Sequence, residues 1–245
     1  DLDTNNFEKL KFKAFFQNPK IKFYIGDIRD RNSVDDAMSG VDYVFHAAAL
    51  KQVPTCEFFP MQATQTNVLG SRNVIDSAIS HGVSKVVSLS TDKAVYPVNA
   101  LGITKALMEK VVEASARNLG EGETVLTVVR YGNVLFSRGS VIPLFMKQIR
   151  ENNAISVTEP EMTRFLLPLK EAIDLVAFAL EKGRQGDIFV RKAPSCLVGD
   201  LAQAVKNIFR SNSEIKTIGM RHGEKMYETL ASKGELLRSE DMGNY

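Results

Sequence analysis

The stretch KVVSLSTDKAVYPVNALGITKALMEKVVEASARNLG, residues 85–120, decides the fold of this chain. It opens with the nearly continuous apolar run of 85–91, which is typical of a strand buried on both faces of a sheet. A short polar segment follows, and residues 99–120 then have the apolar spacing of a helix. A buried strand that leads into a long helix is half of a βαβ unit, in which the strands are parallel.

The same alternation continues on both sides of this stretch. We expect strands at 21–27, 42–49, 85–91, 124–134 and 186–192, helices at 32–40, 61–82, 99–120, 139–152 and 197–209, and a strong helix within 163–183. Alternating strands and helices predict an α/β fold with right-handed crossovers. We therefore predict a Rossmann-like doubly wound parallel sheet with a smaller C-terminal substrate lobe, the pattern becoming mixed after about residue 135.

Composition and charge exclude several classes of function. The 245 residues are 44% hydrophobic and 24% charged, with a net charge of +2, and the charges of both signs alternate, so nothing favours binding to nucleic acid. No apolar run approaches the roughly 20 residues that cross a bilayer, and no signal peptide opens the chain. Cys56 and Cys196 match no metal or redox spacing. We expect a cytoplasmic protein with reduced structural thiols, no metal and no membrane insertion.

Small and polar residues follow each predicted strand. In a doubly wound sheet a nucleotide lies at the carboxyl ends of the strands, so these residues are the first candidates for a site. Each group alone could be an ordinary turn between a strand and a helix. The groups are Asp27-Ile28, Ala47-Ala48-Ala49, Ser90-Thr91-Asp92-Lys93 and Tyr131-Gly132-Asn133.

Six blocks, in order between residues 46 and 230, resemble one family. They are HAAALKQVPTCEFFP, QTNVLGSRNVIDSA, STDKAVYPVNALGITKALMEK, VRYGNVLFSRGSVIPLF, EPEMTRF and RHGEKMYETL. Together they are similar to the extended short-chain dehydrogenase/reductases, in particular the C5-inverting UDP-N-acetylglucosamine 4,6-dehydratases of capsule and O-antigen polysaccharide biosynthesis.

This resemblance implies a domain division and a set of ligands. Residues 1–135 would form a truncated NAD(P)-binding Rossmann-like domain without its first βα unit, and 136–245 mainly a substrate-binding lobe interleaved with the sheet. The cofactor would be NADP, with NAD as the alternative. The substrate would be UDP-N-acetylglucosamine or a related UDP-sugar, and the enzyme would be a homo-oligomer. Its product would be a UDP-4-keto-6-deoxy-N-acetylhexosamine.

The resemblance also assigns the chemistry to Asp92, Lys93 and Lys105. A partly desolvated lysine can accept a proton near neutral pH, and a carboxyl group in a poorly solvated cleft can donate one. Related enzymes carry Tyr-x-x-x-Lys, but Leu101 stands four residues before Lys105 and cannot transfer a proton. We therefore expect proton transfer to be the task of Asp92 and Lys93, while Lys105 binds the nicotinamide ribose.

The remaining site predictions divide between cofactor and substrate. Arginine forks suit a diphosphate geometrically, whereas His46 is expected to be a buried residue at a strand end. For the cofactor we expect Asp27, Ile28, Ala47, Ala48, Ala49, Asn67, Ser90, Lys105, Tyr131 and Asn133. For the substrate we expect Lys51, Thr91, Asn133, Arg138, Arg164, Arg221 and Glu224.

One family feature is missing, which leaves alternatives open. Residues 1–20 contain no glycine, so they cannot supply the Gly-rich turn that holds a cofactor pyrophosphate, and they resemble only loosely the charged helix before the 21–27 strand. We expect a fragment of a longer enzyme; the alternatives are one piece of a split protein or a non-catalytic UDP-sugar-binding paralogue. Within the enzymes, the alternative is a UDP-N-acetylhexosamine 4-epimerase.

Overall fold

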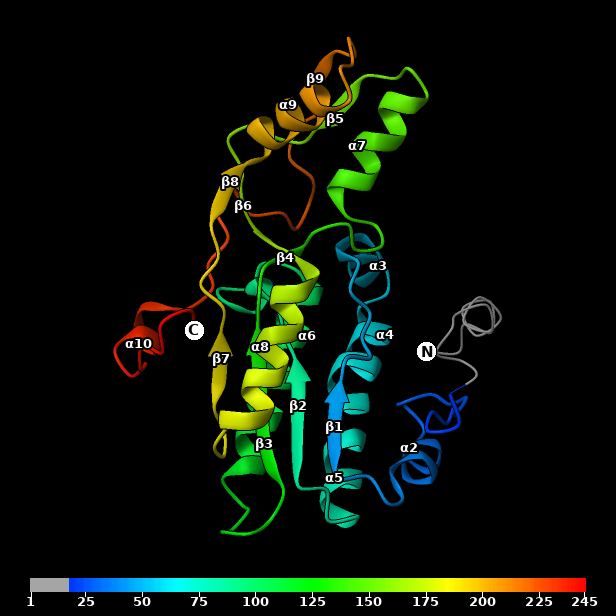
Figure 1. The fold of residues 1–245 in the computed structure, drawn as a ribbon, viewed down its shortest axis with the longest axis vertical. Coiled ribbons are helices and arrows are strands. Elements are labelled where there is room, and N and C mark those ends of the chain that lie inside the picture. The colour runs from blue at the N-terminus through cyan, green and yellow to red at the C-terminus, as the bar shows by residue number, and fades with distance from the viewer. Residues whose placement is uncertain (1–17) are drawn as a thin grey trace.

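A parallel sheet of four strands forms the centre of the computed structural model, which describes residues 18–245 (Figure 1). The strands lie in the order β1-β2-β3-β7, and every pairing between them is parallel. Their bounds are β1 (Tyr43–His46), β2 (Lys85–Leu89), β3 (Val125–Arg130) and β7 (Ile188–Val190). The predicted α/β class and parallel sheet are confirmed.

Helices cover both faces of this sheet, as the continuous apolar strands require. Val86 and Val128 pack on one face with α5 and α6, whereas Val87 and Val129 pack on the other face with α8. The alternation follows from the two-residue period of a strand. The bounds of the covering helices are α5 (Ser71–Ser80), α6 (Ala100–Ala116) and α8 (Leu169–Lys182).

The segment 21–27 is not a strand, and that prediction was wrong. Residues 21–25 are exposed, and the segment has no ladder partner among the described residues. A strand is stable only beside another strand, and the outer edge of β1 is not paired by any strand within 18–245. The predicted helix 32–40 is present as α2 (Arg31–Met38). The charged helix suggested for the N-terminal end lies mostly outside the described residues.

One predicted helix is divided by a π-helical turn, and another begins after a proline. Instead of one helix over 61–82, Pro60 begins α4 (Pro60–Thr64), a π-helical turn covers Gln65–Gly70, and α5 follows. The strong helix predicted within 163–183 is confirmed as α8, which begins after Pro168 because proline cannot lie inside a helix. Residues Thr163–Leu167 form strand β6, and α8 begins after the proline.

The C-terminal lobe has its own core beside the carboxyl ends of the sheet strands, towards which the strand arrows point (Figure 1). Phe145, Ile155, Met162 and Ala202 are fully buried in this core. The lobe elements are β4 (Asn133–Val134), α7 (Val141–Arg150), β5 (Ile155–Val157), β8 (Ser195–Leu197), α9 (Val198–Ile208) and β9 (Ile215–Thr217). Strands β4, β6 and β8 form one small sheet, and β5 pairs with β9. No helix within 18–245 is long and apolar enough to cross a membrane.

Candidate functional site

The turn after β2 places a buried carboxylate beside a lysine. Residues Asp92–Ala94 form a short 3-10 turn, and the Asp92 amide donates a hydrogen bond to the Tyr131 carbonyl at 3.1 Å. The Asp92 side chain is fully buried, and its Oδ1 accepts hydrogen bonds from Thr91 Oγ1 at 2.9 Å and Lys93 Nζ at 3.0 Å. Asp92 Oδ2 has no hydrogen-bond partner within the described residues. The predicted pair is therefore assembled, with one carboxylate oxygen left over.

Helix α6 fixes the position of this turn through a glycine. A Cβ atom on Gly102 would lie 2.3 Å from the Lys93 carbonyl oxygen, so only glycine permits this approach. Asn99 caps the helix by accepting a hydrogen bond from the Gly102 amide at 2.8 Å. The Asn99 side chain also donates to the Gly223 carbonyl at 2.6 Å, which ties a distant segment to the same point.

Lys105 lies under the end of β2, and Leu101 belongs to the core. The Lys105 ammonium donates a hydrogen bond to the Leu89 carbonyl at 2.7 Å, and burial lowers its pKa to about 8. Leu101 is buried with Cys56 and Ala63, so the residue four positions before Lys105 belongs to an apolar contact. Neither cysteine forms a disulfide, and burial raises the pKa of the Cys56 thiol to about 11.

The segment 221–230 lies across the Asp92 turn and adds two residues that the sequence did not reveal. Glu228 Oε1 is 3.6 Å from Lys93 Nζ, and Glu228 Oε2 is 3.0 Å from Lys225 Nζ. Lys225 also donates a hydrogen bond to the Val95 carbonyl at 2.8 Å. In the sequence, Lys225 and Glu228 form an ordinary charge pair three residues apart. Only the resemblance of the block RHGEKMYETL to the family indicated that this region belongs to the site.

The cofactor residues predicted at two strand ends meet at one cavity. A cavity of about 540 Å³ is lined by Asp27, Ile28 and Ala47–Ala49, and a second cavity of about 390 Å³ adjoins it along the edge of β1. The small alanines leave room for a flat ligand against the backbone. Arg29 Nε donates a hydrogen bond to Asp27 Oδ2 at 2.8 Å, and this bond lowers the pKa of the carboxyl group.

The other predicted cofactor residues differ in what their side chains do. The Asn67 amide is hydrogen-bonded within the protein, to the Leu50 backbone and the Thr104 hydroxyl, so it holds the loop after β1. Burial raises the pKa of Tyr131. Asn133 Oδ1 is buried without a hydrogen-bond partner in residues 18–245, which leaves it available to a ligand.

His46 fits its prediction as a buried strand-end residue. Its Nε2 lies 2.7 Å from the Ser71 hydroxyl, and burial lowers its pKa to about 3.

Three of the predicted substrate residues, Lys51, Arg138 and Arg221, lie in segments that meet at α3 (Val53–Phe58). Exposed Lys51 precedes Gln52, whose amide donates to the Arg138 carbonyl at 3.2 Å. Exposed Arg221 precedes His222, and His222 Nε2 is 3.0 Å from Glu57 on α3. Three of the other predicted substrate residues have different places: Thr91 precedes the Asp92 turn, Asn133 is in β4, and Arg164 is in β6.

Arg164 uses its guanidinium within the protein. It donates hydrogen bonds to the Thr163 carbonyl at 2.8 Å and the Lys225 carbonyl at 2.9 Å. The Glu224 carboxylate accepts a hydrogen bond from the Arg221 amide at 3.1 Å. In this structure Arg164 therefore holds the segment 221–230, and Glu224 shapes its turn.

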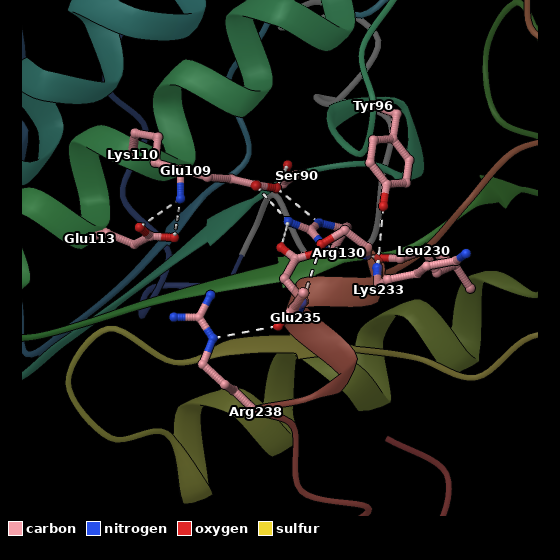
Figure 2. A network of polar contacts seen from close by, with 12 residues as sticks. Ser90, Tyr96, Glu109, Lys110, Glu113, Arg130, Leu230, Lys233, Glu235 and Arg238 are labelled. Carbon is pink, nitrogen blue, oxygen red and sulfur yellow. Dashed lines mark hydrogen bonds and ion pairs between the residues drawn. The ribbon is translucent and has the colours of Figure 1, made fainter.

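A second ion network surrounds Arg130 at the end of β3 (Figure 2). The Arg130 guanidinium donates to Glu109 Oε2 at 2.6 Å, to Glu235 Oε1 at 3.0 Å and to the Leu230 carbonyl at 3.0 Å. Glu109 also accepts a hydrogen bond from the Ser90 hydroxyl. Burial opposes the charge on Glu235, but the hydrogen bonds from Arg130 and Ser232, together with the charge of Arg130, outweigh it and lower the pKa of Glu235 to about 2. This network anchors α10 (Lys233–Leu236) to the sheet.

The fold and the strand-end site define a Rossmann-like α/β protein with its candidate site between the sheet and the C-terminal lobe. The chain belongs to the polysaccharide biosynthesis protein family, whose pattern it matches over residues 2–245. It is 60% identical over 228 residues to a UDP-glucose 4-epimerase of Rickettsia felis, covering 93% of this chain and 67% of that one.

Solved structures are similar along most of the chain. The structure of Pen from Bacillus thuringiensis has a TM-score of 0.90 and 41% identity, covering 96% of this chain and 74% of that one. The dTDP-glucose 4,6-dehydratase DesIV from Streptomyces venezuelae, with NAD and TYD bound, has a TM-score of 0.82 at 22% identity. It covers 93% of this chain and 75% of its own, and at this identity it supports the fold alone.

Proposed function

We propose that this chain forms the catalytic part of a UDP-N-acetylglucosamine 4,6-dehydratase that inverts C5. The observation that carries the proposal is the ion pair of buried Asp92 with half-buried Lys93, together with the apolar packing of Leu101. A proton donor and a proton acceptor stand together at a strand end, while the position of the usual tyrosine is apolar. The Rickettsia felis relative, which is 60% identical, is named a UDP-glucose 4-epimerase, and this supports a UDP-sugar as substrate.

The residues can divide the proton transfers between them. The reaction oxidises C4 to a ketone, removes the C5 proton, expels the C6 hydroxyl as water and reduces C6, so the sugar loses one water overall. Asp92 accepts the C4 hydroxyl proton during the oxidation and then donates it to the departing C6 oxygen, while Lys93 accepts the C5 proton. Since Asp92 Oδ1 is 3.0 Å from Lys93 Nζ, the two groups can also exchange a proton with each other. Return of a proton to the opposite face of C5 gives the inversion.

The cofactor in this proposal is NADP, with NAD as the alternative. When bound, a nicotinamide dinucleotide supplies the redox chemistry at C4 and C6. The residues that would hold it are Asp27, Ile28 and Ala47–Ala49 at the cavity, with Lys105 at the nicotinamide ribose. The cavity and its small lining residues fit a flat nucleotide. No Gly-x-x-Gly-x-x-Gly turn for the pyrophosphate occurs in the 245 residues.

The setting proposed for the enzyme is the cytoplasm, where it would make a precursor of surface polysaccharide as a homo-oligomer. Membership of the polysaccharide biosynthesis protein family supports this use of the product. Substrate contacts are proposed for Lys51, Thr91, Asn133, Arg138 and Arg221. Of these residues, Lys51, Arg138 and Arg221 belong to segments that meet at α3.

The second candidate is a UDP-sugar 4-epimerase. The name of the Rickettsia felis relative, at 60% identity, favours it. An epimerase needs only oxidation and reduction at C4, so it has no task for a separate acid and base at C5 and C6. A third candidate, binding of a UDP-sugar without turnover, predicts no product at all.

Product analysis in deuterated water separates these candidates. The protein, with any residues its gene encodes on either side, is incubated with UDP-N-acetylglucosamine and with UDP-glucose and followed by NMR. A 4-keto-6-deoxy sugar with deuterium at C5 supports the dehydratase. A galacto isomer without loss of water establishes the epimerase instead. Binding of UDP-sugar without any product leaves only the non-catalytic candidate.

A further inference from the structure

Glu228 reaches the candidate catalytic pair from a part of the chain far from it in sequence. Its side chain is only 3% exposed, and its Oε1 lies 3.6 Å from Lys93 Nζ. Lys93 thus lies near two carboxylates, Asp92 at 3.0 Å and Glu228 at 3.6 Å. A buried carboxylate is costly unless other groups stabilise its charge. Its position beside Lys93 therefore needs an explanation.

The hydrogen bonding of Glu228 is incomplete. Lys225 Nζ is 3.0 Å from Glu228 Oε2 and supplies the compensating charge, but this contact lacks hydrogen-bond geometry. Asp92 Oδ2 is likewise without a hydrogen-bond partner in the described part of the chain. Buried polar atoms are almost always paired in folded proteins. Two carboxylate oxygens without a hydrogen bond in residues 18–245, one on Asp92 and one on Glu228, indicate a place where a ligand supplies the missing donors.

We infer that Glu228 is a positioning residue of the catalytic centre that acts through Lys93, an inference that rests on the function proposed above. A negative charge near an amine stabilises the ammonium that forms when the amine takes up a proton. Glu228 therefore holds the Lys93 side chain beside Asp92 and places a negative charge next to the ammonium that forms when Lys93 takes up the C5 proton. The charged groups that face Lys93 are Asp92 on its own turn and Glu228, paired with Lys225, on the segment 221–230. Lys105 on α6 directs its ammonium to the Leu89 carbonyl.

The kinetic test compares Glu228→Gln, which keeps the shape and removes the charge, with Glu228→Asp, which keeps the charge. Glu240→Gln on the exposed C-terminal segment is the control. We expect Glu228→Gln to lower kcat about 10²-fold with little change in KM, because a misplaced catalytic group costs this much. Glu228→Asp should recover part of the loss. Thermal unfolding should be the same for all four proteins.

A second readout does not depend on turnover. Trace acetylation with acetic anhydride at fixed pH, read by peptide mass spectrometry, measures how fast the Lys93 amine reacts. Glu228→Gln should speed labelling of Lys93 and leave that of exposed Lys182 unchanged. If wild-type enzyme makes no 4-keto sugar, the proposed function fails, and the labelling comparison still decides whether Glu228 controls Lys93. Wild-type kcat together with unchanged Lys93 labelling in Glu228→Gln would overturn the inference.

Discussion

Two buried ion clusters lie at the ends of β2 and β3, and they are built differently. In the Arg130 cluster, Arg130 donates two hydrogen bonds to Glu109 and a third to Glu235, so each charge meets a partner at close range. In the Lys93 cluster, Asp92 and Glu228 each keep an oxygen without a hydrogen bond in the described residues. Both clusters tie C-terminal segments to the sheet. The difference suggests that the first serves stability and the second serves chemistry.

We expect the largest effect, a loss of turnover, from a substitution in the Lys93 cluster. Asp92→Asn keeps the shape of the side chain but removes its ability to donate or accept the transferred proton. We expect turnover to fall by about 10²–10⁴-fold, the usual contribution of an acid–base group. The measurement is the rate of product formation by NMR. A variant with near wild-type turnover would remove Asp92 from the mechanism.

The Arg130 cluster should show the opposite response. Glu109→Gln leaves the buried Arg130 guanidinium without its closest charge partner. Removing one partner of a buried pair costs about 3–5 kcal/mol, so we expect the free energy of unfolding in urea to fall by about that amount. A loss below about 1 kcal/mol, the size of a surface pair, would show that this network is not structural.

Gly102 tests how tightly α6 holds the catalytic turn. Gly102→Ala puts a methyl group where the Lys93 carbonyl lies at 2.3 Å, so the turn must move. We expect a loss of about 1–3 kcal/mol in stability, as for other overpacked sites, together with reduced turnover. The matched control is Gly234→Ala on α10, where the added Cβ meets no atom within 4 Å. Equal behaviour of the two variants would contradict the close packing of α6 on the turn.

The pH dependence of stability should reveal Glu235. Its folded pKa of about 2 lies below the ordinary value of 4.5, so its charge stabilises the fold above pH 4.5. This contribution is lost as the pH falls from about 4.5 towards 2. Because 37% of the side chain is exposed, solvent screens the pair, and we expect only about 1 kcal/mol. The free energies of unfolding of wild type and Glu235→Gln, measured in urea between pH 7 and pH 2, should become equal at the acid end.

The smallest effect should come from a surface ion pair. Lys170 and Asp174 on α8 form an i,i+4 pair at 2.9 Å, and the Lys170 side chain is 85% exposed. Exposed pairs contribute little because water screens them. Lys170→Ala should therefore leave the urea midpoint and the turnover unchanged. A clear loss of stability or turnover in Lys170→Ala would mean that burial does not explain the larger effects expected in the Arg130 and Lys93 clusters.

The sequence predicted those parts of the fold that depend on local pattern. β2 and α6 were found because their apolar residues follow strand and helix periods, and Asp92 and Lys93 because they come directly after a buried strand. The segment 21–27 was misread because a strand depends on a neighbouring strand, which local sequence does not report. The helix within 163–183 was found, but strand β6 before Pro168 was not, because its partners β4 and β8 are distant in sequence.

The site was predicted less completely than the sheet. Glu228 could not be found from pattern, since its burial depends on contacts with Lys93, more than a hundred residues earlier in the chain. Arg164 was assigned to a ligand by its neighbours in a motif, yet its guanidinium bonds to two backbone carbonyls. Charge pairs look alike in sequence, and only the packing distinguishes a solvated pair from a buried one.

The most direct test of the difference between the clusters is to measure turnover and urea stability for Glu228→Gln and Glu109→Gln side by side. We predict that Glu228→Gln loses turnover and keeps its free energy of unfolding, whereas Glu109→Gln loses several kcal/mol of stability. The contradictory result is a Glu228→Gln enzyme that turns over normally but unfolds easily. The Lys93 cluster would then be structural, like its neighbour.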